Sequence, residues 1–266
     1  MTIFAHRGAA AVAPENTLAA FRLAGAMRTD FVELDVQESL DGVVVVVHDG
    51  DLMKVGGSPL KIWEATAEQL RAVDIGSRIG PQFKDERVPT LAEALEACSG
   101  VSRVDIELKF YGHNQRLEER VIELVEAAGM QNAIVTMSLN HDMVAKMKRL
   151  RPGWTSGLLV AKAVGDLSHA PGDFLAVEKG MVTRRFLRAA HRAGKPVYVW
   201  TTDDASVMIR MIGLGVDGLI TNRPDVAREV LDRFARMSRA ERLFLFVMTR
   251  LGAEEDLAAP ESELRP

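Results

Sequence analysis

The chain has 266 residues, of which 47% are hydrophobic and 26% are charged, and its formal net charge is -4. This composition is ordinary for a globular protein, and the length allows one large domain or two small ones. A negative net charge without a dense lysine and arginine cluster argues against a nucleic-acid-binding surface. The single cysteine, Cys98, excludes an intramolecular disulfide framework and a thiolate zinc site.

The sequence contains no segment typical of a membrane span or a secretion signal. No stretch approaches the ~18 apolar residues that a spanning helix needs, and the longest apolar run near the C-terminus covers only residues 243–248. Residues 1–15 carry charged side chains in a strand-and-turn pattern, without an apolar core of signal-peptide length. We therefore expect a cytoplasmic protein.

The beginning of the chain predicts a strand, a helix and a strand hairpin. Residues 2–8 form a short strand pattern that ends at a glycine, and Asn16-Thr17 caps an amphipathic helix that runs through residue 27. A strand over 31–38 is followed by an Asp-Gly turn signal and a β-branched run over 43–47. This hairpin brings His48, which directly follows it, back toward the preceding strand.

Residues 49–90 interrupt the regular pattern. Two loop-like stretches, 56–59 and 76–85, flank one expected helix over 67–72. Long irregular segments in a compact domain usually carry function. We therefore expect this insertion to form a lid or rim over a site.

Strands and helices alternate regularly from residue 91 to residue 236. The expected helices cover residues 91–99, 115–128, 141–150, 183–193, 204–213 and 224–236, and the expected strands cover residues 103–110, 133–139, 155–160, 174–178, 196–202 and 216–221. With the earlier strands this gives about eight, mostly joined by helices, which favours a closed TIM (β/α)8 barrel over an open sheet. We expect one catalytic barrel domain over 1–237, interrupted by the insertion 49–90, and a C-terminal helix and tail over 238–266 that packs against the body or a partner subunit.

Carboxylates alternate with apolar residues in two of the expected strands. Glu33 and Asp35 share one face of the strand over 31–38, and Asp105, Glu107 and Lys109 alternate in the same way further along. Buried carboxylates repel one another unless positive charge lies between them, and a hard divalent cation with oxygen ligands is the usual solution. We interpret Glu33, Asp35 and Glu107 as a metal cradle. The alternative is that nearby arginine and lysine side chains neutralise them without a metal.

Histidines and cations occur beside these carboxylates. His6-Arg7, His48 and Lys109 follow or end expected strands, and the carboxyl ends of barrel strands carry the chemistry in such folds. A metal, two proton carriers and two cations suit a phosphodiester. The cations stabilise developing negative charge, one imidazole activates the nucleophile, and the other protonates the leaving alcohol. Histidine suits both proton roles because its ordinary pKa lies near neutrality.

This spacing closely resembles the glycerophosphodiester phosphodiesterase family, whose pattern is His-Arg, Glu-x-Asp and His on a barrel of this kind. The resemblance runs from about residue 3 to about residue 228. Further matching segments are Pro14-Glu15-Asn16-Thr17, Val88-Pro89-Thr90-Leu91, Ile106-Glu107-Leu108-Lys109, Trp200-Thr201 and Gly215-Val216-Asp217-Gly218-Leu219-Ile220-Thr221. Two segments depart from the family. Residues 49–55 differ from the common Asp-x-Thr-Leu-x-Arg-Thr-Thr, and residues 202–204 read Thr-Asp-Asp where the family commonly has Val-Asn.

The resemblance implies the reaction and the roles of the site residues. The implied activity is metal-dependent hydrolysis of glycerophosphodiesters to an alcohol and glycerol 3-phosphate. His6 is implied as the acid and His48 as the base, and Arg7 and Lys109 hold the phosphate. The three carboxylates of the cradle are implied to bind Mg²⁺ or Ca²⁺. Three alternatives stay open: a lysophospholipase D, a sugar-phosphodiester phosphodiesterase and a non-catalytic phosphodiester-binding barrel.

Three further residues are candidates for the rim of the substrate site. Tyr111 follows the expected strand over 103–110, Trp200 belongs to a matching segment, and Glu15 lies in the loop after the first strand. Trp200 could equally close the barrel by core packing, and Glu15 could only anchor its loop.

Overall fold

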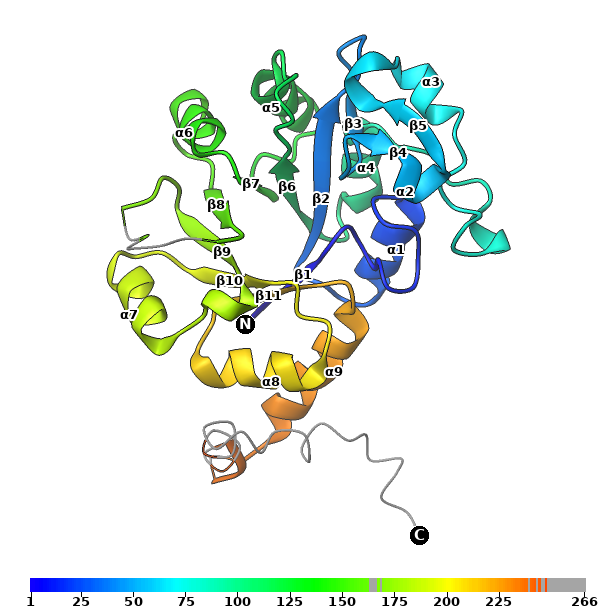
Figure 1. The fold of residues 1–266 in the computed structure, drawn as a ribbon. Coiled ribbons are helices and arrows are strands. Elements are labelled where there is room, and N and C mark those ends of the chain that lie inside the picture. The colour runs from blue at the N-terminus through cyan, green and yellow to red at the C-terminus, as the bar shows by residue number, and fades with distance from the viewer. Residues whose placement is uncertain (163–166, 168, 239, 243, 245–246, 248–266) are drawn as a thin grey trace.

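The computed structural model describes residues 1–162, 167, 169–238, 240–242, 244 and 247, and within them eight parallel strands close into a barrel (Figure 1). The ring runs β1-β11-β10-β9-β8-β7-β6-β2, and β2 closes it by pairing with β1. The strands are β1 Thr2–Ala5, β2 Phe31–Glu38, β6 Arg103–Leu108, β7 Ile134–Ser138, β8 Ser156–Val160, β9 Phe174–Glu178, β10 Val197–Trp200 and β11 Gly218–Thr221. The TIM (β/α)8 fold expected from the sequence is therefore confirmed.

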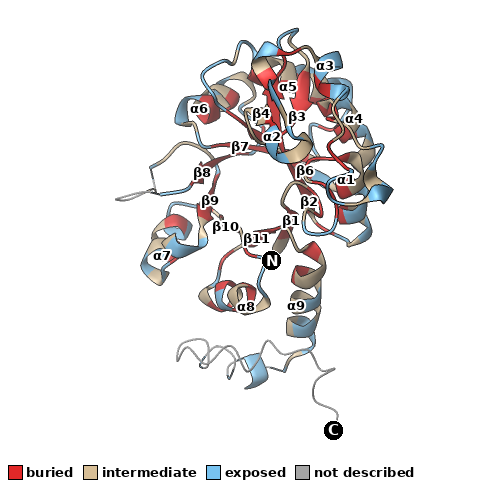
Figure 2. Cartoon of the chain, turned by 45° about the vertical axis from the view of Figure 1, so that its right-hand side comes forward, coloured by how far each residue is buried: buried red, intermediate tan, exposed pale blue. Residues whose placement is uncertain are grey.

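Helices surround the ring and join most of its strands. They are α1 Leu18–Ala26, α4 Leu91–Cys98, α5 Leu117–Ala127, α6 His141–Leu150, α7 Arg184–Arg192, α8 Ala205–Leu214 and α9 Pro224–Arg236. Polar residues begin several of them, because the Thr17, Asn140 and Asp204 side chains accept hydrogen bonds from backbone N–H groups of the first turn. The strands are almost entirely buried between helices and barrel interior (Figure 2).

The barrel interior is apolar at one end and acidic at the other. Near the starts of their strands, the Phe4 ring stacks on Phe31 at 4.7 Å and lies 4.6 Å from Tyr198, which in turn lies 5.0 Å from Phe174. Aromatic residues bury large apolar areas, so this cluster seals the N-terminal end. The chemistry is thereby confined to the opposite, C-terminal end of the barrel.

The parallel register between β2 and β6 brings the acidic residues together. Glu33 lies opposite Asp105, and Asp35 lies opposite Glu107. Because side chains alternate along a strand, all four carboxylates face the interior, and all four are buried. Glu33 and Asp35 lie in the middle of β2 rather than at its end, because β2 continues past the ring to pair antiparallel with β3, Val44–Val46.

The insertion is a small folded unit beside the barrel mouth (Figure 1). It contains β4 Asp51–Leu52, α2 Met53–Gly56, β5 Ser58–Lys61, a 3-10 turn Ile62–Glu64, α3 Ala67–Arg71 and a 3-10 turn Pro81–Phe83. The expected helix over 67–72 is present as α3, whereas the β4–β5 hairpin was not expected. Its strands are short and β5 contains Pro59, so no strand pattern is visible in the sequence. Leu52, Ile62 and Leu70 give the insertion its own buried core.

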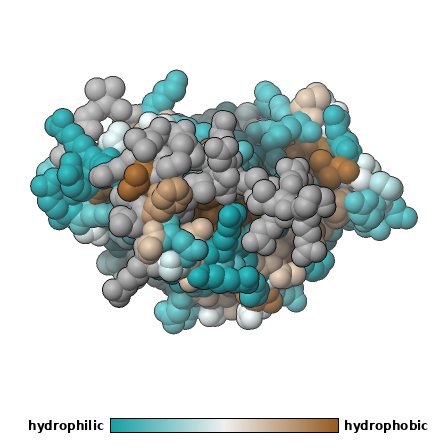
Figure 3. Space-filling model, turned by 90° about the horizontal axis from the view of Figure 1, so that it is seen from below, coloured by the Kyte–Doolittle hydropathy of each residue, from teal (hydrophilic) through white to brown (hydrophobic). Residues whose placement is uncertain are grey.

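The C-terminal helix and tail expected over 238–266 fall mostly on residues outside the described part of the chain. Of the residues described within this range, 238 is not helical, and 240–242, 244 and 247 are helical. The division into a barrel domain and a tail stays a prediction. Figure 3 shows that the described side chains on the face beneath α8 and α9 are mostly hydrophilic, with small hydrophobic patches between them. Within the described residues, no helix has both the length and the apolar character needed to cross a membrane.

Candidate active site

The loop after β1 turns so that His6 and Arg7 reach the same space. Neighbouring strand residues would point to opposite faces, but Arg7 has a φ of 56° and Gly8 a φ of 79°. A Cβ on Gly8 would lie 2.7 Å from the Cβ and carbonyl carbon of Ala20, so only glycine fits both this φ and the contact with α1. The Arg7 backbone N–H donates to Glu33 Oε2 at 2.7 Å. The turn is thereby fixed to the acidic strand.

Glu33, Asp35 and Glu107 form the cluster that the sequence predicted. One carboxylate oxygen from each lies within 4.8 Å of the others, and all three residues are buried. Glu33 Oε1 and Asp35 Oδ1 are buried and have no hydrogen-bond partner among the described residues. Buried oxygens without donors are costly, and converging carboxylate oxygens are what hard divalent cations bind. The donor set therefore fits Mg²⁺ or Ca²⁺.

Two cations contact this cluster but do not neutralise it. Lys109 Nζ lies 2.8 Å from Glu107 Oε1 and 3.5 Å from Asp35 Oδ1, and Arg7 Nε lies 3.3 Å from Asp35 Oδ2. Although burial opposes it, Lys109 and Arg7 hold the pKa of Asp35 below its ordinary value. Burial and the Asp35 charge raise the pKa of Glu107 to about 7, and burial and Asp35 raise that of Glu33 well above its ordinary value. The cluster therefore holds more carboxylates than its two cations can keep ionised.

Asn16 was interpreted as a helix cap, but it holds Asp35 instead. Its Nδ2 donates to Asp35 Oδ2 at 2.8 Å, and its Oδ1 accepts from the Asp35 backbone N–H at 3.2 Å. The cap of α1 is Thr17, whose side chain accepts from Ala20 N. Asn16 has a φ of 57°, which asparagine tolerates better than most residues. The signal that could have identified it is its place in the Pro-Glu-Asn-Thr segment.

His6 is held by a chain of polar side chains that the sequence did not indicate. His6 Nδ1 lies 2.8 Å from Asn222 Oδ1, and Asn222 Nδ2 donates to Asp203 Oδ2 at 2.7 Å. Because Asp203 fixes the amide orientation, Nδ1 carries the imidazole hydrogen and Nε2 is left for proton transfer. Burial, assisted by the charge of Arg7, lowers the pKa of His6 to about 4, so the ring is neutral at pH 7. Asp203 lies in the segment that departs from the family pattern.

His48 is paired directly with a carboxylate. Its Nδ1 lies 2.6 Å from Asp49 Oδ1, and its backbone carbonyl accepts from Gln37 Nε2 at 3.1 Å and from the Tyr111 hydroxyl at 2.8 Å. Burial is the main cause that lowers the pKa of His48, and Lys109 adds to it while Asp35 opposes it. A neutral imidazole beside Asp49 can accept a proton, because the carboxylate then stabilises the imidazolium.

The three candidate rim residues also lie at this mouth. Glu15 accepts from Arg7 Nη1 at 2.9 Å and from Lys54 Nζ at 2.6 Å, so it joins the first loop to the insertion. Tyr111 is 39% exposed and contacts the His48 carbonyl. Trp200 lines the mouth with His6, and its buried Nε1 finds no hydrogen-bond partner among the described residues. All ten residues singled out from the sequence therefore surround one site.

The space between these residues is a small cavity of about 80 Å³. Its polar lining residues are His6, Arg7, His48, Glu107 and Lys109, and its mainly apolar ones are Met137, Leu139, Leu159, Trp200 and Ile220. Two imidazoles, two cations and Glu107 of the acidic cluster line one cavity, which can hold an anion in contact with both proton carriers.

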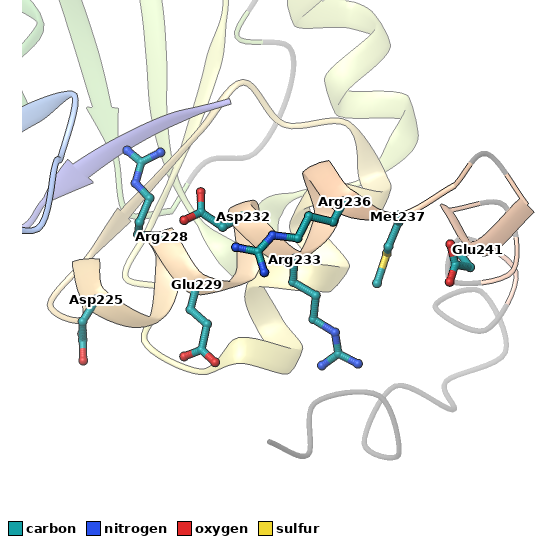
Figure 4. Close-up of a pocket in the computed structure, with 8 residues that line it drawn as sticks. All are labelled: Asp225, Arg228, Glu229, Asp232, Arg233, Arg236, Met237 and Glu241. Carbon is teal, nitrogen blue, oxygen red and sulfur yellow. The ribbon is translucent and has the colours of Figure 1, made fainter. Parts of the chain in front are cut away.

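A wider hollow, of about 660 Å³, lies along α9 and shares no lining residue with the mouth (Figure 4). Its lining residues are Asp225, Arg228, Glu229, Asp232, Arg233, Arg236, Met237 and Glu241. Carboxylates and guanidiniums are mixed along the helix, and Asp225 pairs with Arg223 while Asp232 pairs with Arg28. Such mixed charges are typical of a solvated helix face. We place the chemistry at the barrel mouth.

A (β/α)8 barrel with proton carriers and cations at its C-terminal mouth has the architecture of a barrel enzyme. The family model described as glycerophosphoryl diester phosphodiesterase matches residues 6–226. The chain therefore belongs to the glycerophosphoryl diester phosphodiesterase family, and it is an enzyme of the hydrolase class.

Individual relatives agree with this assignment. A glycerophosphodiester phosphodiesterase of Caldanaerobacter subterraneus is 30% identical over 233 residues, which cover 84% of this chain and 94% of that protein. A solved phosphodiesterase of Oleispira antarctica, in complex with the product sn-glycerol-3-phosphate, has a TM-score of 0.83 at 27% identity, covering 87% of this chain and 97% of that one. A glycerophosphodiester phosphodiesterase of Agrobacterium tumefaciens has a TM-score of 0.74 at 28% identity, covering 86% and 99%.

Proposed function

We propose that this enzyme hydrolyses glycerophosphodiesters to an alcohol and glycerol 3-phosphate, with His6 and His48 as proton carriers beside a divalent cation. The observation that carries the proposal is the cavity in which both imidazoles, Arg7 and Lys109 meet Glu107 of the acidic cluster. The Oleispira antarctica relative, solved with sn-glycerol-3-phosphate, supports this phosphate ester as the product.

Glu33, Asp35 and Glu107 would hold the cation, either Mg²⁺ or Ca²⁺. Three observations support this: the oxygens converge, two of them have no hydrogen-bond partner among the described residues, and the donors are all hard. The bound cation would supply positive charge that favours ionised carboxylates and stabilises negative charge developing on a phosphoryl oxygen. The alternative, neutralisation by Arg7 and Lys109 alone, leaves the pKa values of Glu33 and Glu107 raised.

Arg7 and Lys109 would bind the phosphate. Both are already oriented by carboxylates, Arg7 by Glu15 and Asp35, and Lys109 by Glu107. A guanidinium can donate to two phosphate oxygens at once, whereas an ammonium acts as a point charge. Because these side chains are held before substrate arrives, little reorganisation is needed as charge develops.

The proton roles follow from the partners of the two histidines. His48 is neutral and its Asp49 partner stabilises the imidazolium, so it takes the proton of the attacking water. The bond between phosphorus and the departing alcohol oxygen breaks, and His6 Nε2 gives that oxygen a proton. The pKa of about 4 makes protonated His6 a strong acid, and the anionic phosphodiester must raise this pKa on binding for His6 to carry the proton.

The test is a metal and substrate screen of the purified protein. After treatment with EDTA, Mg²⁺, Ca²⁺ or Mn²⁺ is added with glycerophosphocholine, glycerophosphoethanolamine or bis(p-nitrophenyl) phosphate, and glycerol 3-phosphate is measured directly. We expect turnover only with a divalent ion. Full activity after exhaustive chelation would overturn the metal assignment, and no turnover under any condition would favour a non-catalytic phosphodiester-binding barrel.

Two histidine variants test the proton roles. General acid or base catalysis is typically worth ~10²- to 10⁴-fold. On glycerophosphocholine, His6→Ala and His48→Ala should each lose activity in this range, whereas His191→Ala, at an exposed histidine paired with Asp217, should not. On a p-nitrophenyl diester, whose leaving group needs no proton, His6→Ala should recover and His48→Ala should not. Equal losses on both substrates would contradict distinct roles, and recovery of His48→Ala alone would exchange them.

A further inference from the structure

A second groove continues from the catalytic cavity. It has a volume of about 390 Å³ and shares His48, Glu107, Lys109 and Leu139 with the mouth cavity. His6 lines the mouth cavity but not the groove. The groove therefore extends from the His48 side of the site, along the loops that follow β6 and β7.

The outer part of the groove is apolar although it is open to water. Phe110 is 55% exposed, Leu139 is 50% exposed and Tyr111 is 39% exposed, and all three line it. Single exposed apolar residues are common, but a group of them beside an active site marks a binding surface for apolar groups. Leu139 directly follows β7, and Phe110 and Tyr111 come shortly after the end of β6, so the barrel itself places them at the mouth.

The charges of the groove disfavour a cationic group. Lys109 places an ammonium in the inner part of the groove. Asn140 is a polar residue that lines the groove, but its side chain caps α6. The half-buried ring of Trp63, on the insertion, is already stacked on His113 at 4.1 Å, and Lys61 lies 5.8 Å from its centroid. The exposed rings on this side, Phe110 and Tyr111, line the groove beside Lys109, whose positive charge opposes a choline group there but does not oppose an uncharged hydrocarbon chain.

We propose that the groove binds a hydrocarbon chain on one arm of the phosphodiester, so that the preferred substrate class is lysophospholipids. This inference rests on the proposed function and specifies its substrate. The phosphate occupies the mouth, the acylated glycerol arm extends past His48 into the groove, and the head-group alcohol lies toward His6. Water is added, the bond between phosphorus and the head-group oxygen breaks, and the products are an acylglycerol phosphate and the free alcohol.

The experiment compares substrates that differ only in the chain. Glycerophosphocholine and lysophosphatidylcholines with hexanoyl, octanoyl and decanoyl chains share one leaving alcohol, and below their micelle-forming concentrations all are monomers. Each methylene that the groove buries should raise kcat/KM by up to ~4-fold, since its transfer from water is worth ~0.8 kcal/mol. We expect kcat/KM to rise with chain length until the groove is filled, with choline release as the readout.

Surface variants locate the effect. Phe110→Asn and Leu139→Asn should reduce the ratio of kcat/KM for the decanoyl substrate to that for glycerophosphocholine by ~10-fold or more. Ile79→Asn is the matched control, because Ile79 is 59% exposed but does not line the groove. An equal loss of the ratio in the control would overturn the groove assignment.

The two levels of the proposal fail differently. If glycerophosphocholine is hydrolysed and kcat/KM does not rise with chain length, the lysophospholipid inference is wrong while the proposed function stands. If neither glycerophosphocholine, the acylated substrates nor bis(p-nitrophenyl) phosphate is hydrolysed with any of the metals, the proposed function itself fails.

Discussion

Replacing Glu107 by glutamine should change how the stability of the metal-free protein depends on pH. In the unfolded chain Glu107 titrates at its ordinary pKa of 4.5, whereas in the folded chain burial and the Asp35 charge raise the pKa to about 7. The folded state therefore binds the proton of Glu107 more tightly than the unfolded state does. This proton binding stabilises the fold fully below the unfolded-state pKa, and the stabilisation is lost as pH rises through the folded-state pKa. The difference corresponds to about 3 kcal/mol at ~1.4 kcal/mol per pKa unit.

A divalent cation bound by the acidic cluster should restore the stability that the folded protein loses as pH rises. Binding to the folded state at ~100 times the dissociation constant adds ~2.7 kcal/mol, which for a chain of this size raises Tm by ~5–10 °C. Glutamine offers only a neutral oxygen and cannot titrate. Glu107→Gln should therefore lack both the loss of stability that Glu107 causes as pH rises from 4.5 to about 7 and most of the rise in Tm with Mg²⁺ or Ca²⁺.

Chemical denaturation at several pH values and thermal unfolding with and without the ion measure both effects. Glu123→Gln is the control, because its side chain is 63% exposed on α5 and should respond like the wild type. If Glu107→Gln loses stability with pH as steeply as the wild type and gains the same Tm from the ion, Glu107 is neither strained nor a ligand, and the reasoning is refuted.

Three further substitutions test the supports of the site. Arg7→Lys should lower kcat/KM by ~10²-fold, because an ammonium lacks the planar fork that donates two parallel hydrogen bonds to phosphate oxygens. Arg28→Lys, at an exposed arginine that also has a positive φ, should not lower it, and unchanged kinetics in Arg7→Lys would place Arg7 away from the phosphate. Asn222→Ala should lower kcat by up to ~10²-fold and change KM much less, because the His6 imidazole that Asn222 holds loses its orientation. A wild-type kcat in this variant would refute the positioning role of Asn222. Gly8→Ala should destabilise the fold in chemical denaturation by more than Gly129→Ala, whose φ is also positive but whose Cβ would meet nothing within 4 Å; equal effects would contradict the steric argument.

The barrel and its acidic cluster were predictable because both follow from local alternation. Glu33-x-Asp35 and Asp105-x-Glu107 place carboxylates on one face of two strands, and a parallel register then brings the faces together. The turn that brings His6 and Arg7 into one space was not predictable, because it depends on a positive φ at Arg7, which side-chain patterns do not encode.

Residues that act through distant contacts could not be identified from the sequence. Asn222 meets His6 across 216 positions, and an asparagine after a strand carries no local signal of that contact. Phe110 and Leu139 follow strands that are otherwise buried, so their exposure depends on how the loops leave the barrel. Long-range hydrogen bonds and solvent exposure both require the closed ring, and the pattern of residue types describes only one strand at a time.

The two hydrogen bonds accepted by Glu15 connect the insertion to Arg7, the side chain proposed to bind the phosphate. One oxygen holds Arg7 and the other holds Lys54 of α2, so the position of the guanidinium depends on a segment that lies outside the barrel. Insertions of this kind are where related barrels can diversify, because loops tolerate change better than the strands beneath them. A loop exchanged between relatives would therefore carry over its catalytic effect only if it also brought a cation to the place of Lys54.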